Sequence, residues 1–272
     1  MKPNDYHIER VMSSIADINC VADSNCIAAV ICAAGSSKRM GGKKKEYRVL
    51  PSPTDKPLTV LAAAVSTFCA CREIGPVVIT VPPDEENGEA AACLPPELYR
   101  QKLPGGQPRI SFVPGGPSRR SSVHNALLFL KSCNPSYVLI HDGARPWIKQ
   151  ELIEKVITAA KKHRAAIPAL PLVETPKELS RENHASGEAS FIKRHLKREE
   201  LCAAQTPQGF AFAEILAANE KAREKEETAS RAGEKVEYTD DAEVWGEFEG
   251  RVAVIPGDPA NRKITFPEDL EL

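Results

Sequence analysis

The chain has 272 residues, of which 42% are hydrophobic and 27% are charged. A chain of this length and composition can bury a sizeable core without disulfides or metals, which excludes a disordered, fibrous or mini-protein class. Its 36 Lys and Arg residues nearly balance its 37 Asp and Glu residues, for a net charge of −1. Bulk charge therefore does not favour binding to nucleic acid, and an anionic ligand would have to be met by a local cluster of cations.

The sequence shows no membrane or secretion signal. No apolar run approaches the ~18 residues that a membrane helix needs, and the first residues, MKPNDYHIERVMSS, lack the apolar core of a signal peptide. We therefore expect a cytoplasmic protein that does not contact a membrane. Eight cysteines are present and none forms a C-x-x-C pair, so we expect mostly buried, reduced thiols.

The first half of the chain alternates strand-like apolar segments with segments of helical spacing. Residues 1–25 are polar and are interpreted as an N-terminal extension. The pattern predicts strands at 27–33, 77–81, 110–113, 137–140 and 165–172, and helices at 58–68, 118–130 and 152–162. Residues 82–108 are rich in Pro, Gly and Glu and are expected to form an inserted loop with at most one short helix.

The second half departs from this alternation once. Residues 175–204 are charged and carry no long apolar period, so they are predicted to leave the sheet. We predict helices at 210–232 and 240–248, a last strand at 252–255 and a terminal helix that starts at 267. The pattern is typical of an α/β fold, with a mostly parallel sheet flanked by helices, over residues 26–272. Ligands of such folds bind at the carboxyl ends of the strands, which makes those ends the candidate site.

The loop after the first predicted strand combines small residues with positive charge. Residues 33–37 read Ala-Ala-Gly-Ser-Ser, and six cations lie between Lys38 and Arg48. Small residues allow the backbone to approach a ligand closely, and exposed N–H groups can bind phosphate. The loop contains neither G-x-x-x-x-G-K-[ST] nor G-x-G-x-x-G, so neither a Walker loop nor a dinucleotide fold is expected. A triphosphate-binding loop and a solvated basic loop are the two open interpretations.

The fourth predicted strand ends in His141-Asp142-Gly143-Ala144-Arg145-Pro146. An acid and a base directly after a buried strand are costly to place unless they have a role or pair with each other. The carboxylate could lie near a ribose, a metal or a hydroxyl while Arg145 holds an anion. The alternative is a purely structural turn in which Asp142 and Arg145 pair.

Together with later segments, these residues resemble the 2-C-methyl-D-erythritol 4-phosphate cytidylyltransferases of the non-mevalonate isoprenoid pathway. The resemblance covers residues 27–272 in order. Its motifs are Ala33-Ala34-Gly35-x-x-x-Arg39-Met40, Lys45-x-Tyr47, Gly115-Gly116-x-x-Arg119-x-x-Ser122-Val123, His141-Asp142-x-Ala144-Arg145-Pro146, Pro171-x-Val173-x-Thr175-x-Lys177, Thr206-Pro207-Gln208, Thr239-Asp240 and Asn261-x-Lys263-x-Thr265-x-Pro267-Glu268-Asp269-Leu270.

The resemblance implies a Rossmann-like nucleotidyltransferase domain with a protruding β-arm for homodimerisation, which residues 175–204 would form. It implies transfer of a cytidylyl group from CTP to 2-C-methyl-D-erythritol 4-phosphate, with release of pyrophosphate. The cofactor would be Mg²⁺ or another divalent cation. The partners would be CTP, a polyol phosphate and a second copy of the chain.

The resemblance also implies roles for matched residues. Arg39 and Lys45 would hold the triphosphate, and Lys263 would face the reacting α-phosphate beside Lys45. Asp142 would lie near the ribose and is the candidate metal ligand, unless the substrate phosphates alone hold the metal. The nucleotide would further contact Ala33, Ala34, Gly35, Gly116, Arg119 and Ser122, with backbone at Ala33, Ala34 and Gly116 and the Ser122 hydroxyl reading cytosine. The sugar phosphate would contact Lys263, Arg145, Thr175, Thr206 and Arg198, the last from the partner subunit.

Several positions depart from the family pattern. Ser37 stands where a second glycine is usual, Glu46 replaces a frequent Gln, and Glu174 replaces a usual Asp. Pro117 and Ser121 stand where acidic residues are common. Two alternative functions remain open: a cytidylyltransferase for another polyol phosphate such as ribitol 5-phosphate, and a non-catalytic nucleotide-binding scaffold.

Overall fold

In this computed structural model of the chain, the structure describes residues 26–37, 40–41, 44–51, 58–85, 88–180 and 190–271. The N-terminal extension at 1–25 therefore lies outside the described residues. The described strands are β1 (Ile27–Cys32), β2 (Ile74–Val81), β3 (Ile110–Pro114), β4 (Tyr137–Asp142), β5 (Ala165–Pro171), β6 (Lys177–Leu179), β7 (Ile192–His195), β8 (Cys202–Ala204), β9 (Gln208–Ala211) and β10 (Ala253–Pro256). The helices are η3 (Lys45–Tyr47), α2 (Val60–Ala70), α3 (Glu89–Ala92), α4 (Pro96–Tyr99), α5 (Arg119–Leu130), α6 (Gln150–His163), η4 (Arg198–Glu200), α7 (Phe212–Arg231), α8 (Asp241–Phe248) and η5 (Pro267–Leu270).

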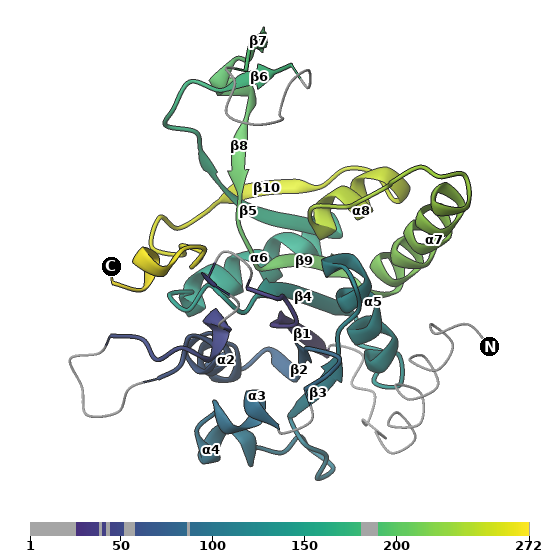
Figure 1. Ribbon diagram of the computed structural model, residues 1–272. Coiled ribbons are helices and arrows are strands. Elements are labelled where there is room, and N and C mark those ends of the chain that lie inside the picture. Colours follow the sequence, from purple (N-terminus) through teal and green to yellow (C-terminus); the bar gives the residue numbers. More distant parts are fainter. Residues whose placement is uncertain are drawn as a thin grey trace.

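The central sheet is mostly parallel, as predicted. Its strand order is β10-β5-β9-β4-β1-β2-β3, and β8 also pairs with β5. Strands β4, β1, β2 and β3 run parallel to one another, as do β5 and β10, whereas β9 and β8 run antiparallel to their neighbours. The carboxyl ends of β1, β2 and β4 therefore lie side by side at one edge of the sheet (Figure 1).

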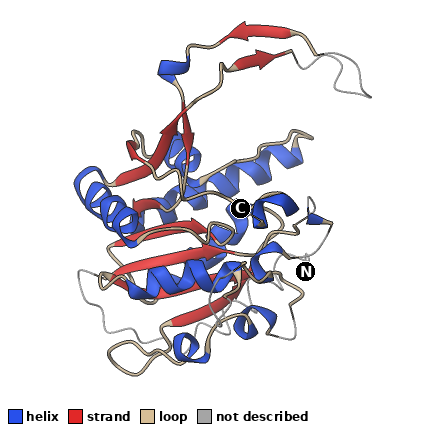
Figure 2. Ribbon diagram, turned by 90° about the vertical axis from the view of Figure 1, so that its left-hand side faces the viewer, coloured by secondary structure: helices blue, strands red, loops and turns tan. Residues whose placement is uncertain are grey.

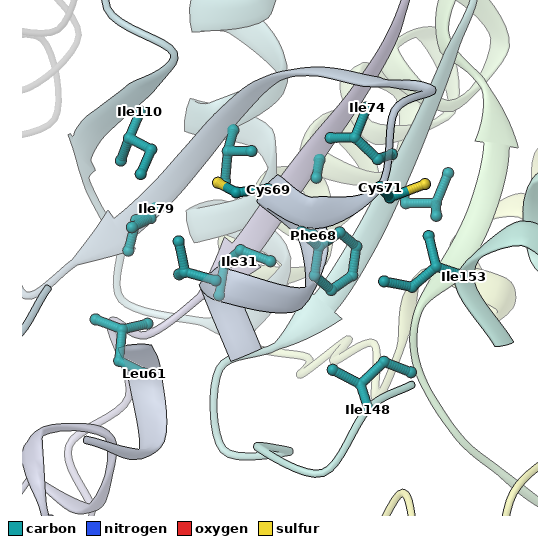
Figure 3. Packing of buried hydrophobic residues seen from close by; sticks show 14 of the residues in the cluster. Ile31, Leu61, Phe68, Cys69, Cys71, Ile74, Ile79, Ile110, Ile148 and Ile153 are labelled. Atoms are coloured by element: carbon teal, nitrogen blue, oxygen red, sulfur yellow. The ribbon is translucent and has the colours of Figure 1, made fainter. Parts of the chain in front are cut away.

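The two faces of the sheet bury two separate apolar clusters. Side chains alternate along β1, so that Ile27 and Ile31 pack on one face and Ala28 and Val30 on the other. Helices α2 and α6 cover the first face, and α5 and α7 cover the second. Figure 3 shows the first cluster, in which Phe68 of α2 lies among isoleucines of the strands and of α6.

The sequence did not predict two strands of the central sheet, β8 and β9. Residues 210–211 were expected to be helical, but they belong to β9, and α7 begins only at Phe212. Strand β9 is four residues long and runs antiparallel between β4 and β5. At Gly209 an added Cβ would lie 2.9 Å from a methyl carbon of Val156, so α6 packs directly on the β9 backbone. This strand is fixed by its neighbours rather than by a period in its own sequence.

The segment at 82–108 has more structure than the expected inserted loop. It carries the two short helices α3 and α4. Ala90, Leu94 and Leu98 of this segment are buried in the cluster beneath α2. The segment therefore completes one face of the core as well as connecting β2 to β3.

Most of residues 175–204 leaves the sheet, as its composition predicts, but residues 202–204 form β8 and belong to the central sheet. Strands β6 and β7 form a separate antiparallel pair, and Figures 1 and 2 show this pair projecting beyond the main body. We call residues 175–204 the arm; residues 181–189 within it are not described. Strand β8 forms the end of the arm and joins it to the sheet by pairing with β5.

Two further findings concern the described residues as a whole. Among them, no helix is both long enough and apolar enough to cross a membrane. The seven described cysteines are free thiols, and only Cys202 is exposed. Three of these seven are buried and three are half-buried, so the prediction of mostly buried thiols is met only in part; Cys20 lies outside the described ranges.

Candidate active site

A cavity of about 550 Å³ opens where the carboxyl ends of β1, β2 and β4 meet the start of α5 and the segment after β10. Each of these elements supplies part of the wall. The lining residues are Cys32, Ala34, Gly35, Ser36, Ser37, Met40, Lys45, Glu46, Thr80, Gly116, Pro117, Ser118, Arg119, Ser122, Asp142, Ala144, Lys263 and Thr265. The cavity lies at the edge of the sheet where the strand pattern predicted a ligand site.

The loop after β1 forms one wall of the cavity. Among the described residues, the amides of Ala34, Gly35 and Ser36 have no hydrogen-bond acceptor, so they can donate to a ligand. Ser37, where the family usually has glycine, has φ +47°, a left-handed conformation that glycine adopts most easily. Its hydroxyl donates to a Glu46 carboxylate oxygen at 3.3 Å and accepts from the Lys45 amide at 3.3 Å. These local bonds explain how a serine fits this position.

The opposite wall begins at the N-terminus of α5. Ser118 caps this helix, because its hydroxyl accepts from the Ser121 amide at 3.0 Å. The Ser122 hydroxyl donates to the Ser118 carbonyl at 2.8 Å and accepts from the Gly116 amide at 3.0 Å. An added Cβ at Gly115 would lie only 2.4 Å from the Ala34 Cβ, so the two loops are in close contact. Ala34, Gly116 and Ser122 line the part of the cavity between these two segments, which we call the slot.

Two lysines from opposite ends of the chain meet at this cavity. The Lys45 ammonium donates to the carbonyl of Ile264 at 2.8 Å, directly beside the backbone of Lys263. The Lys263 ammonium lies 2.9 Å from a carboxylate oxygen of Asp142. Both side chains line the cavity, and Lys263 remains 37% exposed, so its charge is open to a ligand. Arg39, the third predicted catalytic residue, lies outside the described residues.

Asp142 is the centre of a cluster of positive charge. Besides Lys263, its oxygens lie 3.5 Å from Nε of Arg119 and 3.4 Å from Nε of Arg145. Burial alone would raise the pKa of the Asp142 carboxyl, but Arg119, Lys263 and Arg145 together hold it well below its usual range. Asp142 is therefore ionised, and it orients three cations, of which Arg119 and Lys263 line the cavity.

Arg119 has a second partner that the sequence reasoning missed. Its Nη1 donates to Asp241 at 2.7 Å, and the Asp241 side chain is only 1% exposed. Asp241 begins α8, whose cap is Asp240, so the Thr239-Asp240 motif lies one residue before this contact. The position of that motif was the available signal, but only the fold brings Asp241 to Arg119. Glu46, Thr80 and Thr265 line the cavity without having been assigned a role.

Five predicted site residues do not line the cavity. Ala33 is fully buried, its amide donating to Thr80 at 3.1 Å and its carbonyl accepting from Lys44 at 2.6 Å. Thr206 lies behind the wall, where its hydroxyl accepts from the Asp142 amide at 3.1 Å. Arg145 is 12% exposed and donates to the Asn261 carbonyl at 2.8 Å. The remaining two belong to the arm: Thr175 is exposed, and Arg198 donates to the Val173 carbonyl at 2.7 Å.

A divalent cation fits this cavity only with help from a ligand. The described residues contain no group of three or more His, Cys, Asp or Glu side chains that could hold a metal ion. Two carboxylates line the cavity, Asp142 and Glu46, and Asp142 is already shared by three cations. Mg²⁺ is commonly bound through one or two carboxylates together with substrate phosphates. The residues present fit that mode and do not form a protein-only metal cage.

Comparison with known proteins gives one consistent result. The family model described as "IspD: 2-C-methyl-D-erythritol 4-phosphate cytidylyltransferase" matches residues 27–272. The "Bifunctional enzyme IspD/IspF" of Brucella abortus is 34% identical over 243 residues, which are 88% of this chain and 55% of that protein. The chain thus spans about half the length of the curated relatives it matches.

Two solved structures share the fold. The 4-diphosphocytidyl-2C-methyl-D-erythritol synthase of Anaerococcus prevotii is 26% identical, with a TM-score of 0.68 over 92% of this chain and 95% of that one. The 2-C-methyl-D-erythritol 4-phosphate cytidylyltransferase of Thermus thermophilus is 28% identical, with a TM-score of 0.60 over 89% and 94% of the two chains.

Proposed function

We propose that this chain, which belongs to the 2-C-methyl-D-erythritol 4-phosphate cytidylyltransferase family, transfers a cytidylyl group from CTP to 2-C-methyl-D-erythritol 4-phosphate. The products are 4-diphosphocytidyl-2-C-methyl-D-erythritol and pyrophosphate. The observation that carries the proposal is the meeting of Lys45 and Lys263 in one cavity whose other walls are backbone amides and small residues. A cavity of this kind suits a nucleoside triphosphate, whose phosphates carry several negative charges.

The cytosine would lie in the slot between the loop after β1 and the start of α5. Ala34, Gly116 and Ser122 line this slot. The proton of the Ser122 hydroxyl is engaged with the Ser118 carbonyl. The hydroxyl oxygen can accept one further bond from an N–H donor of a base. We propose that this slot, beside which Gly115 packs on Ala34, admits a pyrimidine and excludes a purine.

The reaction needs positive charge around the phosphates more than it needs a general base. An oxygen of the acceptor phosphate is already ionised and attacks the α-phosphorus of CTP, while the bond from that phosphorus to the bridging oxygen breaks and pyrophosphate leaves. The obstacles are repulsion between two polyanions and the charge that builds up on the α-phosphate. Lys45 and Lys263 would hold the reacting phosphates in place and stabilise that charge, and Arg39 is proposed to assist at the triphosphate.

Mg²⁺ or another divalent cation is part of the proposal. When bound, the cation would neutralise charge on the triphosphate and on the departing pyrophosphate. Asp142, and the newly noted Glu46, are the carboxylates available to it in the described cavity. In this proposal Asp142 also keeps Lys263 directed toward the reacting phosphate, because the two side chains are 2.9 Å apart.

The acceptor site is proposed to be completed by a second copy of the chain. Thr175 and Arg198 belong to the arm, which projects beyond the main body in Figure 2, and neither residue lines the chain's own cavity. The described part of the arm exposes Leu179, Phe191 and Ile192, which are 46%, 70% and 52% accessible. Exposed apolar side chains gathered on a thin projection favour burial against another protein surface. A homodimer that carries Arg198 to the partner's cavity would satisfy both observations.

We propose a cytoplasmic location as well. It is supported by the free thiols of the described cysteines, since oxidising compartments favour disulfides.

A pyrophosphate-release assay with CTP and single acceptors tests the proposed function. We expect turnover with 2-C-methyl-D-erythritol 4-phosphate, a requirement for a divalent cation, and no turnover with ATP or GTP. Turnover with ribitol 5-phosphate alone would show that ribitol 5-phosphate is the acceptor substrate. Binding of CTP without turnover of either acceptor would favour a non-catalytic scaffold. Sedimentation velocity on the same sample tests the homodimer.

A further inference from the structure

Lys44 precedes Lys45 in the chain but does not line the cavity. Its ammonium donates to the carbonyl of Ala33 and to the carbonyl of Gly35, each at 2.6 Å. These two carbonyls belong to the loop after β1, on either side of Ala34, which lines the proposed cytosine slot. A single side chain therefore ties down both ends of the peptide that would contact the base.

The loop has few other constraints in the described structure. The amides of Ala34, Gly35 and Ser36 donate no hydrogen bond there, and an added Cβ at Gly35 would meet nothing within 4 Å. Backbone pairing therefore does not hold this stretch, and besides Lys44 its described contacts are the packing of Ala34 against Gly115 and the hydrogen bonds of Ser37. Charge-assisted bonds from an ammonium are about twice as strong as neutral ones, so the two Lys44 bonds are the strongest polar contacts that this stretch makes.

Lys44 is in turn held by the segment that follows β2. Its ammonium lies 5.6 Å from the centre of the Tyr47 ring, within the range of a cation–π contact. The Tyr47 hydroxyl donates to a carboxylate oxygen of Glu85, and the other oxygen of Glu85 accepts from the Ala90 amide at 2.8 Å. Burial lowers the pKa of the Lys44 ammonium, while Glu46 and Glu85 act in the opposite direction and favour its charged form.

We propose that Lys44 is a positioning residue that clamps the nucleotide-binding loop after β1, with Tyr47 and Glu85 connecting this clamp to the segment at 82–108. Its effect on catalysis rests on the proposed function, because the loop must bind CTP for the clamp to matter. The clamp itself is a property of the free protein. By fixing the loop before the nucleotide arrives, Lys44 removes an ordering cost from CTP binding.

The test compares Lys44→Met, which keeps the length of the side chain without its charge, with Lys44→Arg. Lys162→Met is the matched control, since Lys162 is an exposed residue in the last turn of α6 and does not line the cavity. Two quantities are measured: ¹⁵N order parameters of Gly35 and Ser36 in the nucleotide-free protein, and the Kd of CTP by calorimetry. Steady-state kinetics then separate the KM for CTP from kcat.

We expect Lys44→Met to lower the order parameters from about 0.85 toward about 0.6. We also expect it to raise the Kd and KM for CTP by about tenfold, the scale of the entropy cost of ordering one backbone residue when CTP binds. The kcat at saturating CTP should change much less. Lys44→Arg should recover part of the affinity, and Lys162→Met should match the original protein. Tyr47→Phe, which removes the bond to Glu85, should change the order parameters in the same direction by a smaller amount.

The measurements distinguish failure of the Lys44 clamp from failure of the proposed function. Unchanged order parameters in Lys44→Met would overturn the clamp, even if CTP binding weakened, because Lys44 would then act on the nucleotide directly. A fall in kcat with unchanged affinity for CTP would also overturn it. If the original protein does not bind CTP at all, the proposed function fails, while the order parameters still decide whether Lys44 restrains the loop.

Discussion

Replacing Asp142 with Asn removes the negative charge that three cations share while leaving the shape of the side chain nearly unchanged. Asp142 oxygens lie 2.9 Å from Lys263, 3.4 Å from Arg145 and 3.5 Å from Arg119. The side chains of Arg145 and Asp142 are only 12% and 11% exposed, so water cannot replace the lost charge fully. Removing one partner of a buried ion pair costs about 3–5 kcal/mol of stability.

The lower end of that range is expected here. Arg119 keeps its contact with Asp241, and Arg145 keeps the Asn261 carbonyl. Lys263 is 37% exposed and can turn toward water. We therefore predict that Asp142→Asn lowers the free energy of unfolding by about 3 kcal/mol at pH 7. Urea unfolding followed by circular dichroism measures this difference.

Glu178 provides a matched control on the arm. It also pairs with two cations, Lys193 at 2.8 Å and Arg194 at 2.9 Å, but both of these side chains are more than 60% exposed. Exposed pairs of this kind contribute little because water solvates the charges that remain. Glu178→Gln should therefore leave the unfolding midpoint almost unchanged. If Asp142→Asn is no less stable than Glu178→Gln, the buried cluster does not contribute in the way we have derived.

The same cluster determines in which direction the stability of the fold changes with pH. The pKa of Asp142 is lower in the folded protein than in the unfolded chain, where it is about 4. A carboxyl of this kind stabilises the fold at every pH above its unfolded-state pKa, and that contribution is lost as the pH falls below about 4 toward the folded-state pKa. Asp142→Asn should accordingly flatten the loss of stability below about pH 4. If Asp142→Asn loses stability below this pH as steeply as the original protein, Asp142 is not the group responsible.

Three further outcomes are expected. Lys45→Ala or Lys263→Ala should lower kcat by about 10²-fold or more, the scale of losing one preorganised charge contact, in a pyrophosphate-release assay on protein shown to be folded; a normal kcat would remove that residue's role. Arg198→Ala should raise the KM for the sugar phosphate and leave the Kd of CTP unchanged, and loss of CTP binding would refute the assignment of the arm. Cys32 lines the cavity, but burial raises its pKa to about 12. The Cys32 thiol is therefore almost entirely protonated at pH 8, so iodoacetamide should label the exposed Cys202 and spare Cys32 in mass-spectrometric mapping. Equal labelling of the two cysteines would contradict this assignment.

The sequence by itself determined the parts of this protein that depend on local pattern. The apolar run of β1 and the small residues after it predicted both a buried strand and a loop that a ligand can approach. The helical spacing at 118–130 predicted α5, and the charged composition of 175–204 predicted a departure from the sheet. Because the carboxyl ends of parallel strands share one edge, this pattern also located the cavity.

The tertiary structure alone decided which distant groups meet. Strand β9 has no period of its own and exists because β4 and β5 pair with it while α6 packs against Gly209. Asp241 was assigned no role until the fold placed it against Arg119, and Lys44 was one cation among several until it contacted two carbonyls of the loop. Hydrophobic spacing reports which face of an element is buried, but an ion pair or a hydrogen bond between residues far apart in the chain leaves no period in either segment.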